Sequence, residues 1–212
     1  MPYDTVRKFE QEMAEYCGSR YAVSVSSCTN AIFLCLMYYK TTIDMPITLP
    51  KHTYVGVACA VKNAGYEIEW SDERWDGAYM LYPTKIVDSA LRLYEGMYDK
   101  LYQDAYVCLS FHSRKHIGIG RGGMILTDDK EAAQWLRRAR FDGRDECEQL
   151  KDNFTMTGWN MYMTPEQAAR GLTLLHFYKE TENHPDIDDY DTYPDLSKVQ
   201  VFNEADIFDE GF

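Results

Sequence analysis

Apolar residues recur along the first 180 residues in two spacings, which predict alternating helices and strands. Steps of three and four residues, as at Val6, Phe9 and Met13, are typical of a helix with one buried face. We expect helices over residues 4–17, 31–39, 54–63, 128–141 and 165–178. Short apolar runs predict strands over residues 21–25, 47–49, 67–70, 85–87, 105–111 and 122–127. This alternation indicates an α/β layered domain with a largely parallel sheet.

The last part of the chain has a different composition. Residues 181–212 hold ten of the 34 carboxylates and a single basic residue, Lys198, so most of the formal charge of −12 resides there. Such a segment is typically extended, and we expect a domain over residues 1–180 followed by an acidic extended tail over 181–212. The tail is either a solubilising terminus or an arm that packs on a partner subunit through apolar side chains. These side chains are Tyr190, Tyr193, Val201, Phe202, Ile207 and Phe208.

Charge and cysteine usage exclude several classes of protein. No Lys/Arg-rich run offers a face for nucleic acid, so we expect no nucleic-acid partner. The six cysteines are scattered, without a Cys-x-x-Cys pair, which indicates reduced thiols and a cytoplasmic protein. We also expect no membrane association, because the start of the chain lacks a secretion signal and no apolar run approaches 18 residues.

Polar residues follow three of the predicted strands, at the edge where ligands of α/β sheets gather. Residues 26–30, a Ser-Ser-Cys-Thr-Asn turn, open a helix, and free N–H groups at a helix start suit a phosphate. Ordinary N-capping by a hydroxyl explains this turn equally well. Asp88 follows the strand at 85–87, and Ser110 and Lys115 follow the strand that starts at residue 105.

Two other motifs suggest different chemistry. Residues 118–123 satisfy G-x-G-x-x-G, but they lead into a strand, whereas a dinucleotide-binding turn leads into a helix. His112 and His116 have the spacing of a metal pair without the carboxylate of an H-E-x-x-H site, and we expect no metal. Glycines beside Lys115 would let this lysine approach a bound cofactor without steric conflict.

A lysine in the core of an α/β domain is a candidate nucleophile. Desolvation and a neighbouring cation such as Arg114 would lower its pKa and leave a reactive amine. With a phosphate site and a carboxylate, such a lysine indicates pyridoxal 5'-phosphate (PLP). Lys115 would form the Schiff base, Asp88 would keep the pyridine nitrogen protonated, and the helix start would bind the phosphate.

Six short motifs occur in an order that resembles a known family. They are residues 26–31, 49–54, 87–90, 109–115, 120–123 and 158–160. Over about residues 8–178 the chain resembles the DegT/DnrJ/EryC1/StrS sugar aminotransferases. The resemblance implies the fold-type I PLP architecture, in which a large three-layer α/β/α domain has a mostly parallel sheet. It also implies a smaller C-terminal domain and a homodimer with shared active sites.

The matching motifs imply roles for individual residues. Lys115 resembles the Schiff-base lysine and proton shuttle, and Asp88 resembles the partner of the pyridinium nitrogen. Tyr54 occupies the position that stacks on the cofactor ring. Further cofactor-binding positions are Cys28 (through its backbone), Thr29 and Ser110 in the phosphate cup, and Asn160, which would reach the phosphate of the other subunit.

The family resemblance implies a PLP-dependent aminotransferase with ping-pong transfer of an amino group, from glutamate to a keto group of a nucleotide-linked sugar. Three departures qualify this expectation. Leu91 stands where the family usually has a Gln or His, the stretch from Trp70 to Asp88 is short, and the acidic tail stands where a C-terminal domain is expected. A non-catalytic or regulatory PLP-binding protein is therefore the alternative.

Overall fold

A computed structural model describes residues 3–40, 42–146, 151–181, 184–187 and 189–203. Its helices are α1 (Asp4–Cys17), α2 (Cys28–Tyr39), α3 (Val55–Asn63), α4 (Met97–Leu101), α5 (Lys130–Ala139) and α6 (Pro165–Lys179). Its strands are β1 (Tyr21–Val25), β2 (Ile47–Pro50), β3 (Ile68–Ser71), β4 (Tyr79–Leu81), β5 (Ile86–Asp88), β6 (Tyr106–Ser110) and β7 (Gly123–Thr127).

The strands form a mixed sheet, in which β1, β5 and β6 run in the same direction and β4 and β7 run against them. Five strands lie in the order β1-β7-β6-β5-β4, and β2 and β3 form a second, parallel pair. Thr48 bridges to Tyr82 beside β4, which joins the two sheets at one point. β5 and β6 are parallel, whereas β7 runs antiparallel to both of its neighbours and β4 runs antiparallel to β5. The connections explain this, because β4–β5 and β6–β7 are joined without a crossover helix, which parallel neighbours need.

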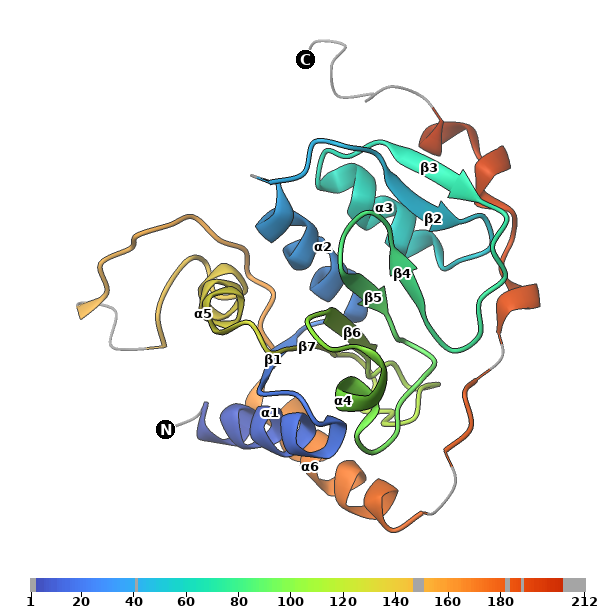
Figure 1. Cartoon of the computed structure of the whole chain (residues 1–212). Coiled ribbons are helices and arrows are strands. Elements are labelled where there is room, and N and C mark those ends of the chain that lie inside the picture. The colour runs from blue at the N-terminus through green and yellow to red at the C-terminus, as the bar shows by residue number, and fades with distance from the viewer. Residues whose placement is uncertain (1–2, 41, 147–150, 182–183, 188, 204–212) are drawn as a thin grey trace.

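Helices cover both faces of the sheet, as expected of a three-layer α/β/α domain (Figure 1). On one face, α2, α3 and α5 pack against alternate strand residues such as Val23 and Ile125. On the other face, α1, α4 and α6 pack against the intervening residues, such as Val107 and Leu126. The pleat of each strand thus supplies two separate cores.

Local sequence signals explain where several helices begin and end. Gly18 ends α1 in the left-handed conformation at φ 85°. Ser27 caps α2 by accepting a hydrogen bond from the N–H of Asn30. Thr164 and Gln167 form a reciprocal capping box at the start of α6. The three-residue strand β4 and the five-residue helix α4 were not expected, because elements so short carry almost no periodicity.

The described residues of the acidic tail pack against the same chain. Short 3₁₀ turns occur at Tyr190–Thr192, Leu196–Lys198 and Gln200–Phe202. Leu196 and Phe202 are buried in the core on the α2–α3 side of the sheet, and Val201 is exposed. Ile207 and Phe208, two of the side chains suggested for a partner contact, lie outside the described residues. Among the described helices, none has the length and apolar content needed to cross a membrane.

Candidate active site

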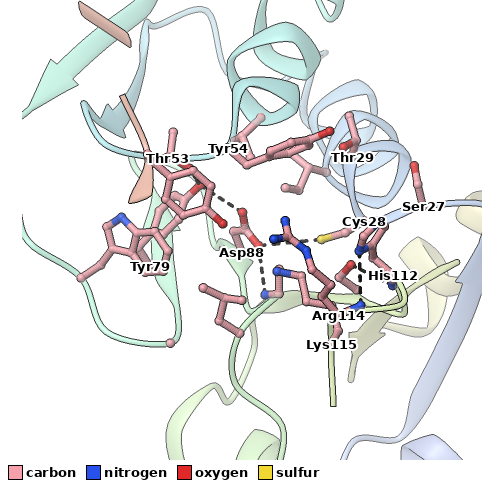
Figure 2. A pocket seen from close by; sticks show the side chains of 18 of the residues that line it. Ser27, Cys28, Thr29, Thr53, Tyr54, Tyr79, Asp88, His112, Arg114 and Lys115 are labelled. Atoms are coloured by element: carbon pink, nitrogen blue, oxygen red, sulfur yellow. Dashed lines mark hydrogen bonds between the residues drawn. The ribbon is translucent and has the colours of Figure 1, made fainter. Parts of the chain in front are cut away.

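A cavity of about 280 Å³ lies at the carboxyl ends of β1, β5 and β6. These three strands run in the same direction, because β1 and β6 both run antiparallel to the intervening β7. Six of the expected site residues line this cavity: Cys28, Thr29, Tyr54, Asp88, Ser110 and Lys115. Figure 2 shows Cys28, Asp88 and Lys115 converging on one space from different segments of the chain.

Asp88 is the buried carboxylate of the cavity. Its Oδ2 accepts a hydrogen bond from the Tyr79 hydroxyl at 3.0 Å, and its Oδ1 accepts one from the N–H of Ala90 at 3.1 Å. The Cys28 thiol lies 3.8 Å from Oδ1. Burial raises the pKa of the Asp88 carboxyl, while the bonds from Ala90 and Tyr79 and the charge of Lys115 act in the opposite direction. The side chain is therefore oriented by its neighbours and presented to the cavity.

Lys115 is half-buried and faces the same cavity. Among the residues that the structure describes, none lies within hydrogen-bonding or ion-pairing distance of its ammonium group. Burial lowers the pKa of this ammonium, whereas the carboxylates of Asp189 and Asp88 raise it. An amine that is neither paired nor fully solvated is the form required of a nucleophile at neutral pH.

The start of α2 forms the end of the cavity where an anion would bind. In the described part of the chain, no group accepts a hydrogen bond from the N–H of Cys28 or of Thr29. A Cβ on Gly123 would lie 2.4 Å from the carbonyl carbon of Ser27 and 2.5 Å from the nitrogen of Cys28. The absence of a side chain at Gly123 thus lets β7 support this helix end. Free N–H groups and the helix dipole together favour a phosphate at this point.

Aromatic side chains form much of the remaining wall. Tyr54, the residue before α3, is half-exposed, and its ring lies beside Thr29 above Gly56, where a Cβ would come within 2.6 Å of the ring. Ser110 ends β6, and its hydroxyl accepts a hydrogen bond from the N–H of His112. These positions agree with a flat ligand held between Tyr54 and the end of the sheet.

Several lining residues were not expected from the sequence. They are Thr53, Trp75, Tyr79 and Tyr193, among others. Tyr79 is the most informative, since it donates to Asp88 and also contacts the hydroxyl of Thr53. Burial raises the pKa of the Tyr79 phenol well above its usual range, so it remains a donor at neutral pH. Tyr79 pairs with Asp88 in the antiparallel hairpin of β4 and β5. Recognising this hairpin in the sequence would have placed the tyrosine beside the carboxylate.

Two other expected positions lie elsewhere or differ in chemistry. Asn160 is exposed outside the cavity, and its amide donates to the Asp142 carboxylate at 3.1 Å. Its contact with the cofactor of a partner subunit stays a prediction. Leu91 is buried and lines the cavity, so this part of the wall is apolar.

The glycine loop and the histidine pair do not form a separate site in the part of the chain that is described. Gly122 lines the cavity and Gly123 begins β7, so the glycines lead into a strand. His112 Nδ1 lies 3.4 Å from the N–H of Arg114, and His116 Nε2 lies 3.1 Å from the carbonyl of Pro185. No cluster of three or more metal-ligating side chains occurs among the described residues.

Replacing Tyr79 with phenylalanine is expected to weaken PLP binding several-fold. The substitution removes a donor from Asp88, so the pKa of this buried carboxyl rises further and its charged form becomes less stable. Titration of the cofactor-free protein with PLP, followed by absorbance, measures the change. Tyr106→Phe is the matched control, because the Tyr106 hydroxyl binds Asp129 at 2.8 Å, outside the cavity. Equal affinities of the two variants would contradict the role given to Tyr79.

The comparisons with known proteins agree with this geometry. The family model described as the DegT/DnrJ/EryC1/StrS aminotransferase family matches residues 1–84 and 102–187. The GDP-perosamine synthase of Caulobacter vibrioides is 26% identical over 207 residues, covering 79% of this chain and 55% of that protein. This chain thus spans little more than half the length of that relative.

Two solved structures share the fold. Spr1654 from Streptococcus pneumoniae, in its PLP-form, has a TM-score of 0.69 at 16% identity, with 83% of this chain and 60% of that chain covered. PseC from Helicobacter pylori, an aminotransferase involved in the biosynthesis of pseudoaminic acid, has a TM-score of 0.66 at 18% identity, covering 83% and 58%. With its family model matched over most of its length, this chain belongs to the DegT/DnrJ/EryC1/StrS aminotransferase family.

Proposed function

We propose that this chain binds PLP in the cavity and transfers an amino group from an amino acid to a keto group of a nucleotide-linked sugar. The observation that carries the proposal is the unpartnered Lys115 amine and the buried Asp88 carboxylate in one cavity, beside the free N–H groups at the start of α2. Family membership supports the reaction class. The names of two similar proteins, a GDP-perosamine synthase and PseC, support a sugar acceptor.

The residues of the cavity match the chemical groups of PLP. The N–H groups of Cys28 and Thr29 suit its phosphate, and Lys115 suits its aldehyde. Asp88 suits a protonated ring nitrogen, because a buried carboxylate needs a cationic or donor partner. Arg114 and Arg121 add positive charge to the lining. When bound, PLP supplies an electron-withdrawing ring that stabilises negative charge on a neighbouring carbon.

The protein's own residues would then position groups and move protons. The Nζ of Lys115 would take a proton from the α-carbon of the amino donor and return it to the cofactor, which a lowered pKa makes efficient near neutral pH. The Asp88 carboxylate would keep the ring nitrogen protonated. The buried wall formed by Leu91 and Tyr79 would exclude water from this space.

The donor, the partner and the location are further parts of the proposal. Glutamate as amino donor and a ping-pong order of transfer come from the family resemblance. A homodimer with shared sites would place Asn160 of each subunit against the phosphate of the other, consistent with its exposure here. A cytoplasmic location stays a prediction.

A visible spectrum tests the proposal. Purified protein mixed with PLP should show the absorbance of lysine-linked cofactor, and glutamate should convert it to the amine form of the cofactor. Absence of binding would contradict the proposal. Binding without any response to amino donors would favour the non-catalytic alternative, which the apolar Leu91 at a position usually polar in the family specifically supports.

Asp88→Asn is expected to stabilise the cofactor-free protein while weakening PLP binding. Burial raises the pKa of Asp88 in the folded state. As the pH rises above the ordinary carboxyl pKa, the unfolded chain loses this proton before the folded chain does, so folding becomes less favourable until the raised pKa is passed. The neutral amide avoids this cost. The melting temperature of the variant should therefore exceed that of the native protein at pH 7, and the difference should vanish near pH 3. A variant less stable at both pH values would contradict this expectation.

A further inference from the structure

A segment outside the α/β core returns to the cavity after α6. We call its described residues, 184–187 and 189–203, the C-terminal segment. In Figure 1 it is the orange-to-red part of the chain that rises beside β2 and β3. It contributes Tyr193 to the lining of the cavity, next to residues of the sheet edge. The sequence places this segment in the acidic tail, where no part of the pocket was expected.

The first anchor of the C-terminal segment lies directly after β5. Two nitrogens of Arg92 donate to the Asp186 carboxylate at 2.8 and 2.5 Å, and both side chains are about four-fifths buried. The N–H of Ile187 donates to the carbonyl of Leu91 at 2.9 Å. Burial strengthens such a charged pair relative to one on the surface.

Gly77 leaves the space that this anchor needs. Its φ of +65° is one that side chains rarely adopt, and a Cβ there would lie 2.4 Å from the carboxyl carbon of Asp186. The glycine thus admits the C-terminal segment against the edge of the cavity. The glycine at this position is therefore a second observation, independent of the ion pair, that supports the contact between Asp186 and the edge of the cavity.

Further anchors follow β2 and precede β4. His52 Nδ1 lies 2.8 Å from the carbonyl of Tyr193, and the N–H of Leu196 donates to the carbonyl of Lys51 at 2.9 Å. Arg74 pairs with both carboxylate oxygens of Asp191 at 3.0 Å. The C-terminal segment is therefore fixed at three loops around the cavity.

Tyr193 lines the same cavity as Lys115. The rings of Tyr190 and Tyr193 lie 5.8 and 6.0 Å from the ring of Trp75, which also lines the cavity. Of the charges that raise the pKa of Lys115, the carboxylate of Asp189 has the largest effect. Lys115 thus has this segment on one side and the sheet edge on the other.

We propose that Tyr193, held by the C-terminal segment, forms a wall of the cavity and limits the size of molecule that reaches Lys115. The segment is not part of the sheet or its covering helices, so without it this side of the cavity would be open. A closed wall excludes water and restricts the poses of a bound molecule. The inference rests on the proposed function in one respect, since it takes Lys115 as the reacting amine.

Amine-reactive reagents of two sizes test the wall on the cofactor-free protein. Acetic anhydride is the small reagent and the N-hydroxysuccinimide ester of biotin the bulky one. Peptide mass spectrometry gives the extent of labelling at Lys115 and at the exposed Lys130, which serves as internal reference. In the native protein, the bulky-to-small ratio should be several-fold lower at Lys115 than at Lys130. Tyr193→Ala should raise the ratio at Lys115 several-fold.

Three further variants keep this test decisive. Tyr193→Phe retains the ring and should keep the native ratio, as should Lys198→Ala, in which the altered side chain is 81% exposed. Tyr193→Leu, which preserves apolar contact with Trp75, should raise the ratio and replaces Tyr193→Ala if the latter misfolds. An unchanged ratio in folded Tyr193→Ala or Tyr193→Leu would overturn the wall. Because no PLP is used, failure of PLP binding would contradict the proposed function alone.

Discussion

Replacing Lys115 with alanine is expected to remove the absorbance of lysine-linked PLP and to abolish amino transfer. Among the described residues that line the cavity, Lys115 is the one lysine, so no second amine there could take over. Burial lowers the pKa of its ammonium. Loss of its proton transfer alone would slow the reaction by about 10²–10⁴-fold. The expected readouts are the visible spectrum after addition of PLP and the conversion of bound cofactor by glutamate.

Two variants separate chemistry from charge. Lys115→Arg keeps a cation in the cavity but cannot bond to the aldehyde, so it should also lack the linked absorbance. Lys130→Ala removes an exposed lysine on α5 and should behave as the native protein. Retention of the linked absorbance in Lys115→Ala would show that another amine binds the cofactor, and would contradict the assignment.

Replacing Glu10 with alanine is expected to lower the free energy of unfolding by about 3–5 kcal/mol, the usual cost of leaving a buried charge without its partner. Glu10 lies in α1 and Arg140 follows α5, and both are almost fully buried. The carboxylate binds the Arg140 guanidinium and accepts bonds from the N–H and hydroxyl of Ser24 at 2.9 and 2.8 Å. In the variant, the carboxylate of Glu146, 2.9 Å from the Arg140 guanidinium, would be the carboxylate that remains beside it.

Urea unfolding of the cofactor-free protein measures this cost. Glu12→Ala is the control on the same helix, because Glu12 pairs with Lys179 at 2.9 Å where both side chains are 36% exposed. Exposed pairs contribute about 0–1 kcal/mol. Losses of similar size in the two variants would show that the pair at Glu10 is not the buried link between α1, β1 and α5 that its contacts indicate.

The longer elements could be predicted from periodicity alone, and the strand directions could not. The spacing of Val6, Phe9 and Met13 determines α1 because a helix of 14 residues repeats its buried face several times. β4 has three residues and α4 has five, so neither repeats its pattern. The reversal of β7 depends on its pairing with β1, about 100 residues earlier, which no local pattern records.

The candidate site likewise contains residues that local sequence could predict and residues that it could not. Lys115, Asp88 and Thr29 could be predicted because each lies within a few residues of the end of a predicted strand, and the ends of strands that run the same way meet at one edge. Tyr79 and Tyr193 were missed because they reach the cavity through contacts that are distant in sequence or through an unexpected strand. Local chemistry thus indicated the candidate reacting groups, while tertiary packing determined the walls around them.

The position of β7 has a consequence for the order in which the cavity can form. Within the described sheet, β1 is joined to β6 through β7 alone. During synthesis, residues from Cys28 to Lys115 therefore emerge before β7, the strand that joins β1 to the rest of the sheet. PLP binding would then stabilise only chains in which β7 has paired on both sides, since a ligand favours the state that binds it. A polypeptide cut before Gly123 would contain Asp88, Lys115 and α2 but lack the strand that pairs with β1 on one side and with β6 on the other.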